Sequence, residues 1–511
     1  MFIFPPKRMW ARVLAVLAVA HSCAPSVLAQ TSNPHAGGLP RLSGAYTSSP
    51  QHPRVFVAPG DVNNLVSRIN SEATFSARAF LRLSGQIKVD LVAKNDWSRS
   101  YSGCRLNTYL YTFSYEHPEV AHGGHLLDQL RSDTNVAPEK DPPIAAAIVA
   151  ARLALYATLV KRGAAPPAGA PPVDQAIALA KRILLAWANH GFRGAKGEFL
   201  SSPTQFCDDQ GRFVRLDQSN VGLQIGRGVI YSVHAQDLLQ SIGAIDTNEV
   251  RDLNAMHAAL FQLIRTASNF RFHLPELSRP QQTCELYSNH VGAALAGLLS
   301  IARLLDDGRK FDAVLYGSDG ATVFDIPWTA YFDHAIYGEA DRPIQCYVNS
   351  GPDSLTSHPS YQTPIVAPGE IEDRYRNANR LQGIGYPMGT LEHLYNAAEI
   401  MKKAGFDPYG YRGRHRQSIE LATQYYACFA KHVGFRKIVT PENARNCPDF
   451  QQYVGQSVND VDTTILMGAY RFPENVAITE LDAAAKAEKT KASNASALEA
   501  LDPVRFGRWR D

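Results

Sequence analysis

The strongest constraint on the fold is a helical spacing of apolar residues that returns along most of the chain. Between residues 53 and 471, successive segments carry apolar side chains three and four positions apart, over about three turns or more. Strand-like alternation is scarce and local, which disfavours a doubly wound sheet or a barrel of parallel strands. The sequence therefore predicts an all-α protein with helices over 145–161, 173–189, 229–242, 249–267, 291–305, 389–404 and 417–430.

Helix breakers separate these segments. The stretch 163–172 contains only Gly, Ala and Pro, and residues 405–408 read Gly-Phe-Asp-Pro, so each ends one helix and lets the chain reverse. Such helix hairpins stack into solenoids or curl into a ring, and no short fixed-period repeat of the solenoid type is present. We therefore expect a single large (α/α) toroid, an incomplete helical barrel, over residues 30–480.

Two further segments stand apart by composition. Residues 311–379 are rich in Gly, Pro, Asp and Tyr and only partly helical in pattern; long loops of this kind inside compact domains are usually functional or disordered. Their aromatic residues favour order. Residues 481–511 form a tail of low complexity, in which we expect a marginal helix or disorder and no chemistry.

The first 29 residues have the features of a signal peptide. Lys7, Arg8 and Arg12 surround the start of an apolar run over 13–20, and residues 27–29 read Val-Leu-Ala, which predicts cleavage before Gln30. Acylation of Cys23 is a weaker alternative, because the residues before it fit lipoprotein processing poorly. No later segment approaches the roughly 18 to 20 apolar residues of a membrane helix. We expect a periplasmic or secreted protein without a membrane span.

Charge limits the class of partner. Removal of residues 1–29 takes away three basic residues and no acidic one, which leaves 48 Lys and Arg against 48 Asp and Glu. A polyanion must then be bound by a local basic cluster, unlike in nucleic-acid-binding proteins, which usually carry a basic field. We expect no nucleic-acid partner.

The cysteines fit an oxidising compartment. Six remain after cleavage, and six thiols allow fifteen complete pairings that the sequence does not separate. We favour Cys428 with Cys447, because a helix and the loop after it can fold back together. No Cys-x-x-Cys spacing exists, and His117, His122 and His125 lack partners at ligand spacing, so we expect no catalytic metal and no cofactor.

Two short blocks place polar residues at the start of a predicted helix. In the first, Asn289 and His290 precede a run of small and apolar residues that ends near Leu299. The second, residues 379–399, carries Arg380 and Tyr386 just before its helix. In a ring of helix hairpins, such positions would face the same open end.

At these two blocks the sequence resembles the alginate lyases of the α/α-toroid type, including mannuronate lyases and their glucuronan-cleaving relatives. The resemblance follows the order Asn-His, an Asp-rich turn with Phe-Asp, Arg, Tyr and Leu-Glu, which here are Asn289-His290, Asp306-Asp307, Phe311-Asp312, Arg380, Tyr386 and Leu391-Glu392. Residues 397–409 resemble the helix that follows in that family and the end of this helix, and weaker similarity covers residues 52–54 and 226–239. The chain departs from mannuronate lyases in an Arg-to-Tyr spacing one residue shorter and in the long segment between the blocks.

The resemblance implies cleavage of a 4-linked polyuronate, an anionic polysaccharide, by β-elimination. It implies that Asn289, His290 and Arg380 neutralise the substrate carboxylate, so that the C5 proton becomes acidic, and such preorganised donors are worth several kcal/mol each. Tyr386 would then remove that proton and protonate O4, because both lie on one side in mannuronate and glucuronate. The expected substrate-binding residues are Arg227, Gln382, Trp328, Tyr331 and His393.

Each residue also has a structural interpretation. Asn289 could cap a helix, Tyr386 could pack at a turn, and Arg380 could be a surface charge. Arg227, in Gly-Arg-Gly without the Gly-Lys-Ser/Thr of a phosphate loop, could form a structural ion pair instead of lining a substrate groove. Core packing is the simpler role for the aromatic residues of the long segment, Trp328, Tyr331 and Tyr337.

Two rival functions remain open on the sequence. A glycoside hydrolase with a helical toroid needs two opposed carboxylates, for which the candidates are Asp208, Asp209, Asp333, Glu370 and Glu372. A carbohydrate-binding protein could use the same cleft without chemistry.

Overall fold

The protein is all-α, as predicted, with very little sheet. The computed structural model describes residues 38–71, 74–92, 143–192, 197–202, 215–270, 288–318, 326–341, 366–372, 384–458 and 461–491. The α-helices are α1 (Pro59–Ile69), α2 (Phe75–Val92), α5 (Pro143–Lys161), α6 (Val173–Ala186), α7 (Arg215–Ser241), α8 (Thr247–Phe270), α10 (Asn289–Leu304), α11 (Gly308–Tyr316), α12 (Trp328–Ala335), α15 (Gly385–Lys403), α16 (Ile419–His432), α17 (Pro441–Ala444), α18 (Val461–Arg471), α19 (Val476–Thr479) and α20 (Asp482–Lys491).

The remaining elements are short. A π-helical turn, Trp187–Gly191, continues α6, and a 3-10 helix spans Phe450–Tyr453. Strands β1 (Ser43–Gly44) and β2 (Phe406–Asp407) form an antiparallel pair in which Ser43 lies opposite Asp407.

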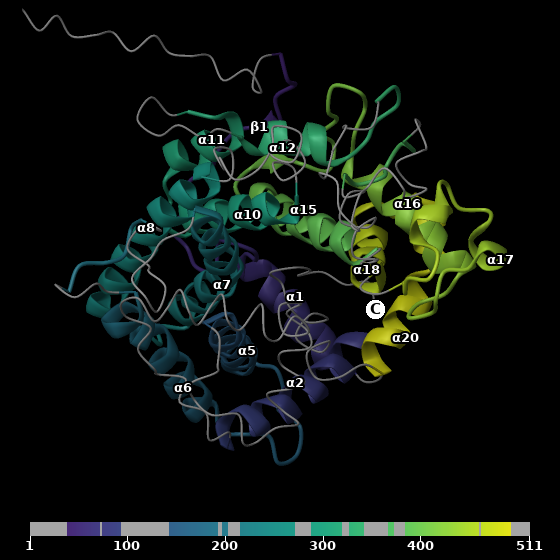
Figure 1. Ribbon diagram of the computed structural model, residues 1–511. Coiled ribbons are helices and arrows are strands. Elements are labelled where there is room, and N and C mark those ends of the chain that lie inside the picture. Colours follow the sequence, from purple (N-terminus) through teal and green to yellow (C-terminus); the bar gives the residue numbers. More distant parts are fainter. Residues whose placement is uncertain are drawn as a thin grey trace, which may run out of the picture.

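The helices form a ring, as Figure 1 shows. The inner helices α5, α7, α10, α15 and α18 pack against one another in that order, and α18 then contacts α20, which returns to α2 and so to α5. Helices α6, α8, α11, α12 and α16 pack on the outside of this series. Because each inner helix is followed along the chain by an outer one, the inner helices run in parallel. The predicted toroid of helix hairpins is therefore the observed architecture.

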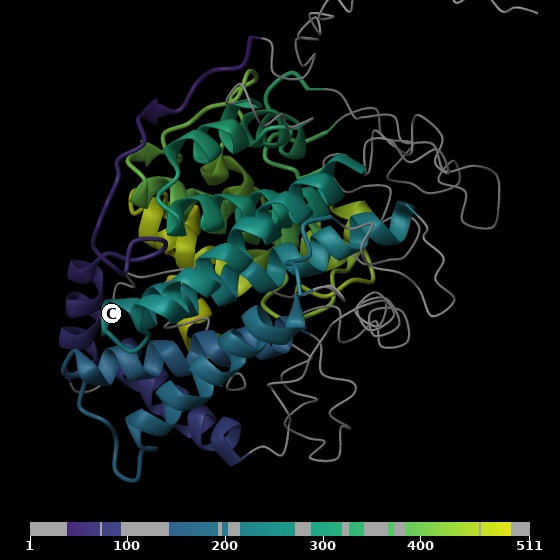
Figure 2. The same cartoon turned by 90° about the vertical axis from the view of Figure 1, so that its left-hand side faces the viewer.

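The segment 38–58 covers one end of the ring (Figure 2). The amide of Thr47 donates to the carbonyl of Ala404, after the end of α15. The Arg54 guanidinium donates to the carbonyl of Leu304, the last residue of α10, and the Arg54 amide donates to Asp237 near the end of α7. These contacts tie the carboxyl ends of the inner helices together, so their amino ends lie at the opposite end of the ring.

Small residues let α7 and α10 approach closely. A Cβ added to Gly297 of α10 would lie 2.8 Å from the Gly226 carbonyl oxygen of α7, and one added to Gly226 would lie 3.2 Å from the Ala293 carbonyl oxygen. Gly226 therefore lies beside the first half of α10. This contact fixes the amino-terminal halves of the two inner helices relative to each other.

Two glycine-to-alanine variants should have opposite effects on stability. Gly297→Ala places its methyl group against a backbone oxygen, which cannot move aside alone, and we expect a loss of about 1–3 kcal/mol in the free energy of unfolding. Gly85→Ala in α2 meets no atom within 4 Å, and we expect a gain of about 0.5–1 kcal/mol from the better helix former. Urea unfolding of both variants checks this. A Gly297→Ala protein as stable as the wild type would contradict the close packing.

The largest difference from the predicted helix boundaries is at α7, and the described part of the predicted tail is helical. Helix α7 begins at Arg215, well before the predicted residue 229. In the tail, where we expected a marginal helix or disorder, α20 begins at Asp482, packs against α18 and α2, and buries Ala485 completely. The described part of the tail therefore belongs to the ring.

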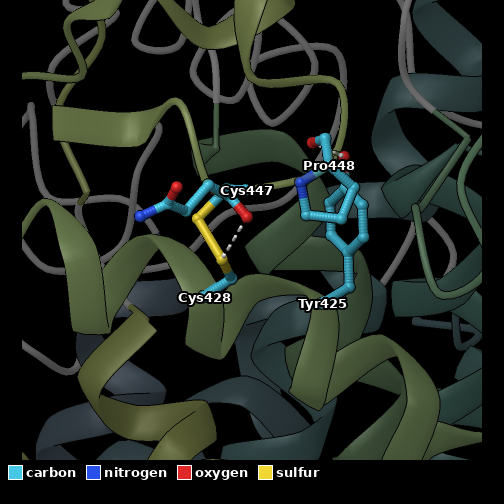
Figure 3. The surroundings of a disulfide bond; sticks show 5 residues. Tyr425, Cys428, Cys447 and Pro448 are labelled. Carbon is cyan, nitrogen blue, oxygen red and sulfur yellow. Dashed lines mark hydrogen bonds between the residues drawn. A yellow bond between two sulfur atoms is a disulfide. The ribbon is translucent and has the colours of Figure 1, made fainter. Parts of the chain in front are cut away.

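A disulfide joins Cys428 of α16 to Cys447, as predicted (Figure 3). The two Cα atoms lie 5.6 Å apart across a sequence separation of 19 residues. The adjacent Tyr425 hydroxyl donates to the Pro448 carbonyl at 3.2 Å, so the loop is held to α16 at two neighbouring points. All other cysteines of the chain lie outside the described residues.

Two histidines are buried between the helices of the ring. His257 of α8 is fully enclosed, its Nε2 atom lies 3.0 Å from the Ser232 hydroxyl of α7, and desolvation by burial lowers its pKa from 6.5 to about 3. His234 of α7 packs edge-on against Phe56, and burial lowers its pKa to about 3 as well. Both side chains are therefore neutral in the folded protein at ordinary pH.

Acid should destabilise the protein through these histidines. Between their folded pKa of about 3 and their unfolded pKa of 6.5, the unfolded chain binds the extra proton. The free energy of unfolding is therefore not reduced by these histidines above pH 6.5. As the pH falls from 6.5 toward 3, it declines by about 1.4 kcal/mol per pH unit for each histidine. His257→Gln should lower the slope of unfolding free energy against pH by that amount. The control is His432→Gln, an exposed position, and an unchanged slope in His257→Gln would contradict the assignment.

Candidate functional site

The amino-terminal ends of α10 and α15 lie side by side. A Cβ added to Gly389, in the second turn of α15, would lie 3.3 Å from Asn289 Nδ2 and 3.9 Å from Asn289 Cβ. Asn289 is the first residue of α10. The amide of Asn289 therefore reaches α15 at the end of the ring opposite to the segment 38–58.

Asn289 lies in the first turn of α10 but is not the N-cap of this helix. The N-cap of α10 is Ser288, whose backbone is extended and whose carbonyl accepts from the amide of Val291 at 3.1 Å. Asn289 is only 2% exposed. The N-cap position is therefore held by Ser288, whose side chain makes no capping hydrogen bond, and the Asn289 side chain is directed at the neighbouring helix.

Tyr386 is the second residue of α15 and is partly exposed. Pro387 follows it in the first helical turn, where a missing backbone N–H costs nothing. Residues three apart share a helix face, so Tyr386 lies on the same face as Gly389 and one turn nearer the start of the helix. This is the face on which α15 meets Asn289.

His290 faces the other neighbour of α10. Together with Gly222 and Leu223 of α7 and Ala267 and Ser268 of α8, it lines a small cavity of about 10 Å³. Consecutive helical residues point about 100° apart, which places Asn289 toward α15 and His290 toward α7 and α8. Asn289 and His290 therefore lie on different sides of the first turn of α10.

The remaining predicted residues are distributed along the same helices. Arg227 is half-buried on α7, next to the contact of Gly226 with α10. His393 lies two turns beyond Tyr386 on α15 and is 5% exposed. Arg380 and Gln382 lie outside the described residues.

The two aromatic residues predicted to stack on sugar are enclosed by protein. Trp328 is 1% exposed and its ring contacts Phe332 and Tyr411, with centroids 4.9 and 5.8 Å apart. Tyr331 is fully buried, and its hydroxyl donates to the carbonyl of Ser288 at 3.2 Å. Stacking on sugar is not supported for either ring, because no ring face is open to a ligand. Their burial agrees with the alternative interpretation, in which they pack in the core. Tyr337 is also buried.

The carboxylates considered for hydrolysis are buried as well. Asp333 accepts from the Arg414 amide at 2.6 Å, and Glu370 accepts from Gln452 Nε2 at 2.9 Å. Glu372 is 2% exposed. Carboxylates in protein hydrogen bonds of this kind stabilise loops and offer no open pair to a glycosidic bond. Asp208 and Asp209 lie outside the described residues.

Across the described ranges, no group of three or more His, Cys, Asp and Glu side chains is arranged to hold a metal ion. In the same residues, no helix is both long and apolar enough to span a membrane. His117, His122 and His125 fall outside this part of the chain.

Sequence reasoning overlooked the glycines that bring the site together. Gly389 leaves room for the Asn289 amide, and Gly222 lies against Ala267, where an added Cβ would approach the Ala267 Cβ to 2.5 Å. Gly222 and Gly226 are four residues apart, a spacing of small residues that predicts close helix contact. That signal was available in the sequence.

No protein-family model matches the sequence, and no curated protein does. Among solved structures, the chain is similar to an alginate lyase from Bacteroides ovatus, with 11% sequence identity and a TM-score of 0.46. The superposition covers 88% of this chain and 98% of the other. This is a remote likeness, from which nothing about the reaction follows.

Proposed function

We propose that the protein is a polysaccharide lyase that cleaves 4-linked polyuronates of the mannuronate or glucuronate type by β-elimination. The observation that carries the proposal is the meeting of Asn289 with the first turns of α15, where Tyr386 lies on the facing side. The resemblance of both helix starts to α/α-toroid alginate lyases points to the same reaction.

The chemistry requires donors for a carboxylate. The C5 proton of a uronate is acidic only when the adjacent carboxylate is neutralised and can accept the charge that develops in the transition state. The Asn289 amide is preorganised by burial, and the amino ends of α10 and α15 add positive partial charge at the same place. Arg380 is proposed as the fixed cation that completes this set.

Tyr386 is proposed as both base and acid. In mannuronate and glucuronate the C5 proton and O4 lie on one side of the sugar, so the tyrosine in its phenolate form can accept the C5 proton, and the phenol that results can donate a proton to the leaving oxygen. The breaking C4–O4 bond then leaves a double bond between C4 and C5. His290, directed toward α7 and α8, would approach from another side, which is the geometry that guluronate would require.

Purified protein incubated with poly-mannuronate, poly-glucuronate and poly-guluronate tests the proposal. Elimination creates an unsaturated non-reducing end that absorbs ultraviolet light, and we expect this signal with at least one of the first two polymers. New reducing ends without absorbance would instead establish a hydrolase. Binding without any cleavage would establish a carbohydrate-binding protein, and either result would overturn the proposed reaction.

We propose a periplasmic or secreted location. The disulfide between Cys428 and Cys447 supports it, because disulfides persist in oxidising compartments. Expression of the full chain in a bacterium, followed by fractionation and N-terminal sequencing, should yield a protein that begins at Gln30. Recovery of the uncleaved chain in the cytoplasm would refute the proposed export.

A further inference from the structure

Helix α12 supports the first turn of α10 through one tyrosine. The hydroxyl of the fully buried Tyr331 donates to the Ser288 carbonyl at 3.2 Å. That carbonyl also accepts from the amides of Val291 and Gly292, at 3.1 and 3.4 Å. The phenol therefore bonds to the residue immediately before Asn289, at the point where the helix begins.

Gly292 makes this contact possible. A Cβ at residue 292 would lie 2.5 Å from the Tyr331 hydroxyl oxygen and 3.0 Å from the ring carbon that bears it. Any other residue would push the phenol away from the Ser288 carbonyl. The aromatic ring of Tyr331 therefore contacts the first turn of α10 directly.

Tyr331 is itself fixed by its own helix. Its amide donates to the Pro327 carbonyl at 2.9 Å, and the Thr329 hydroxyl donates to the Leu315 carbonyl of α11 at 2.9 Å. Trp328 and Phe332 pack on Tyr411. The hydroxyl of Tyr331 therefore links helix α12, which is held by α11 and Tyr411, to the start of α10.

We propose that Tyr331 is a positioning residue that holds Asn289 in place against α15. The inference rests on the proposed function, because Asn289 matters as a donor to the substrate carboxylate. Donors stabilise a transition state only when they are already placed, and a displacement of about 1 Å can cost on the order of a hundredfold in rate. The hydroxyl of Tyr331 sets that placement, although it touches no substrate.

The test compares Tyr331→Phe with Tyr411→Phe. Tyr411 packs on Trp328 and Phe332 of the same helix α12, and its hydroxyl also donates to a backbone carbonyl, that of Pro40 at 3.0 Å, but this bond does not involve α10. Each variant loses one hydrogen bond from a buried tyrosine to a backbone carbonyl, so their melting temperatures should fall alike. We expect kcat on the best polyuronate to fall about ten- to a hundredfold only in Tyr331→Phe, with KM changed less than kcat.

Hydrogen exchange gives a second measurement that does not depend on activity. Without the Tyr331 hydroxyl, the amides of Val291 and Gly292 should exchange several-fold faster than in Tyr411→Phe. Equal exchange in both variants would overturn the positioning role, whether or not the wild type is a lyase. Equal kcat values in both variants would overturn its link to turnover. An inactive wild type refutes the proposed function alone, and the exchange comparison still decides the role of Tyr331.

Discussion

Replacing Tyr386 by phenylalanine should reduce turnover on the best polyuronate by about a hundred- to ten-thousand-fold. The variant keeps the ring, its packing and the turn before Pro387, and removes only the group proposed to carry the proton. One phenol that performs both transfers should lie at the upper end of this range. Substrate affinity should change little, because the hydroxyl acts mainly in the transition state. Initial rates from ultraviolet absorbance provide the measurement.

Tyr395→Phe is the matched control for this experiment. Tyr395 lies on the same helix, but its hydroxyl contacts the Thr423 hydroxyl of α16 at 2.6 Å, on the outer side of α15. The control should melt at a slightly lower temperature and retain turnover. If a well-folded Tyr386→Phe variant also retains near-normal turnover, Tyr386 is not the catalyst, and His290 becomes the base to test.

The inner helices were predictable because most of them are apolar on the faces that pack within the ring. α5, α10 and α15 begin within a few residues of their predicted starts. The helix predicted for α7 is too short, because the first half of α7 contains Gly222, Gly226 and polar residues, which have a low intrinsic helix propensity. Close contact with α10 stabilises the helix there, and such a tertiary effect does not appear in a local pattern.

Of the candidate site, the sequence predicted only that its residues lie at the starts of helices. Sequence placed Asn289 and Tyr386 at the entries of two inner helices, and a ring of hairpins brings such entries to one end. For Trp328 and Tyr331 the sequence left packing and sugar binding both open, because an aromatic residue in a loop-rich segment has the same local signature whether it packs or binds. The structure separates these roles by burial and by the bond from Tyr331 to Ser288.

A buried ion pair joins α15 to the end of α18. Arg471 donates from Nε to Glu399 Oε1 at 2.7 Å and from Nη2 to Oε2, and the Tyr409 hydroxyl donates to the same carboxylate. Glu399 is 1% exposed. Desolvation by burial opposes the charge of Arg471, but the Glu399 carboxylate outweighs it and raises the pKa of Arg471 above its ordinary value. Arg471 therefore stays charged in the folded protein.

Removing one partner of this pair should have a large effect on stability. Arg471→Met leaves the Glu399 carboxylate buried with the Tyr409 hydroxyl but without its cation, and we expect the free energy of unfolding to fall by about 3–5 kcal/mol. Lys431→Met is the control, because its salt bridge to Glu480 is about half exposed and should contribute less than about 1 kcal/mol. Urea unfolding at neutral pH measures both.

The double variant Glu399→Leu with Arg471→Met separates the value of the pair from the cost of breaking it. Both side chains are then apolar and similar in size, so we expect the lost stability to return except for the cost of about 1–3 kcal/mol of leaving the Tyr409 hydroxyl without its acceptor. A loss in Arg471→Met no larger than in Lys431→Met would mean that water reaches Glu399. A double variant as unstable as Arg471→Met would mean that the ion pair itself, through its two-point geometry, holds α18 against α15.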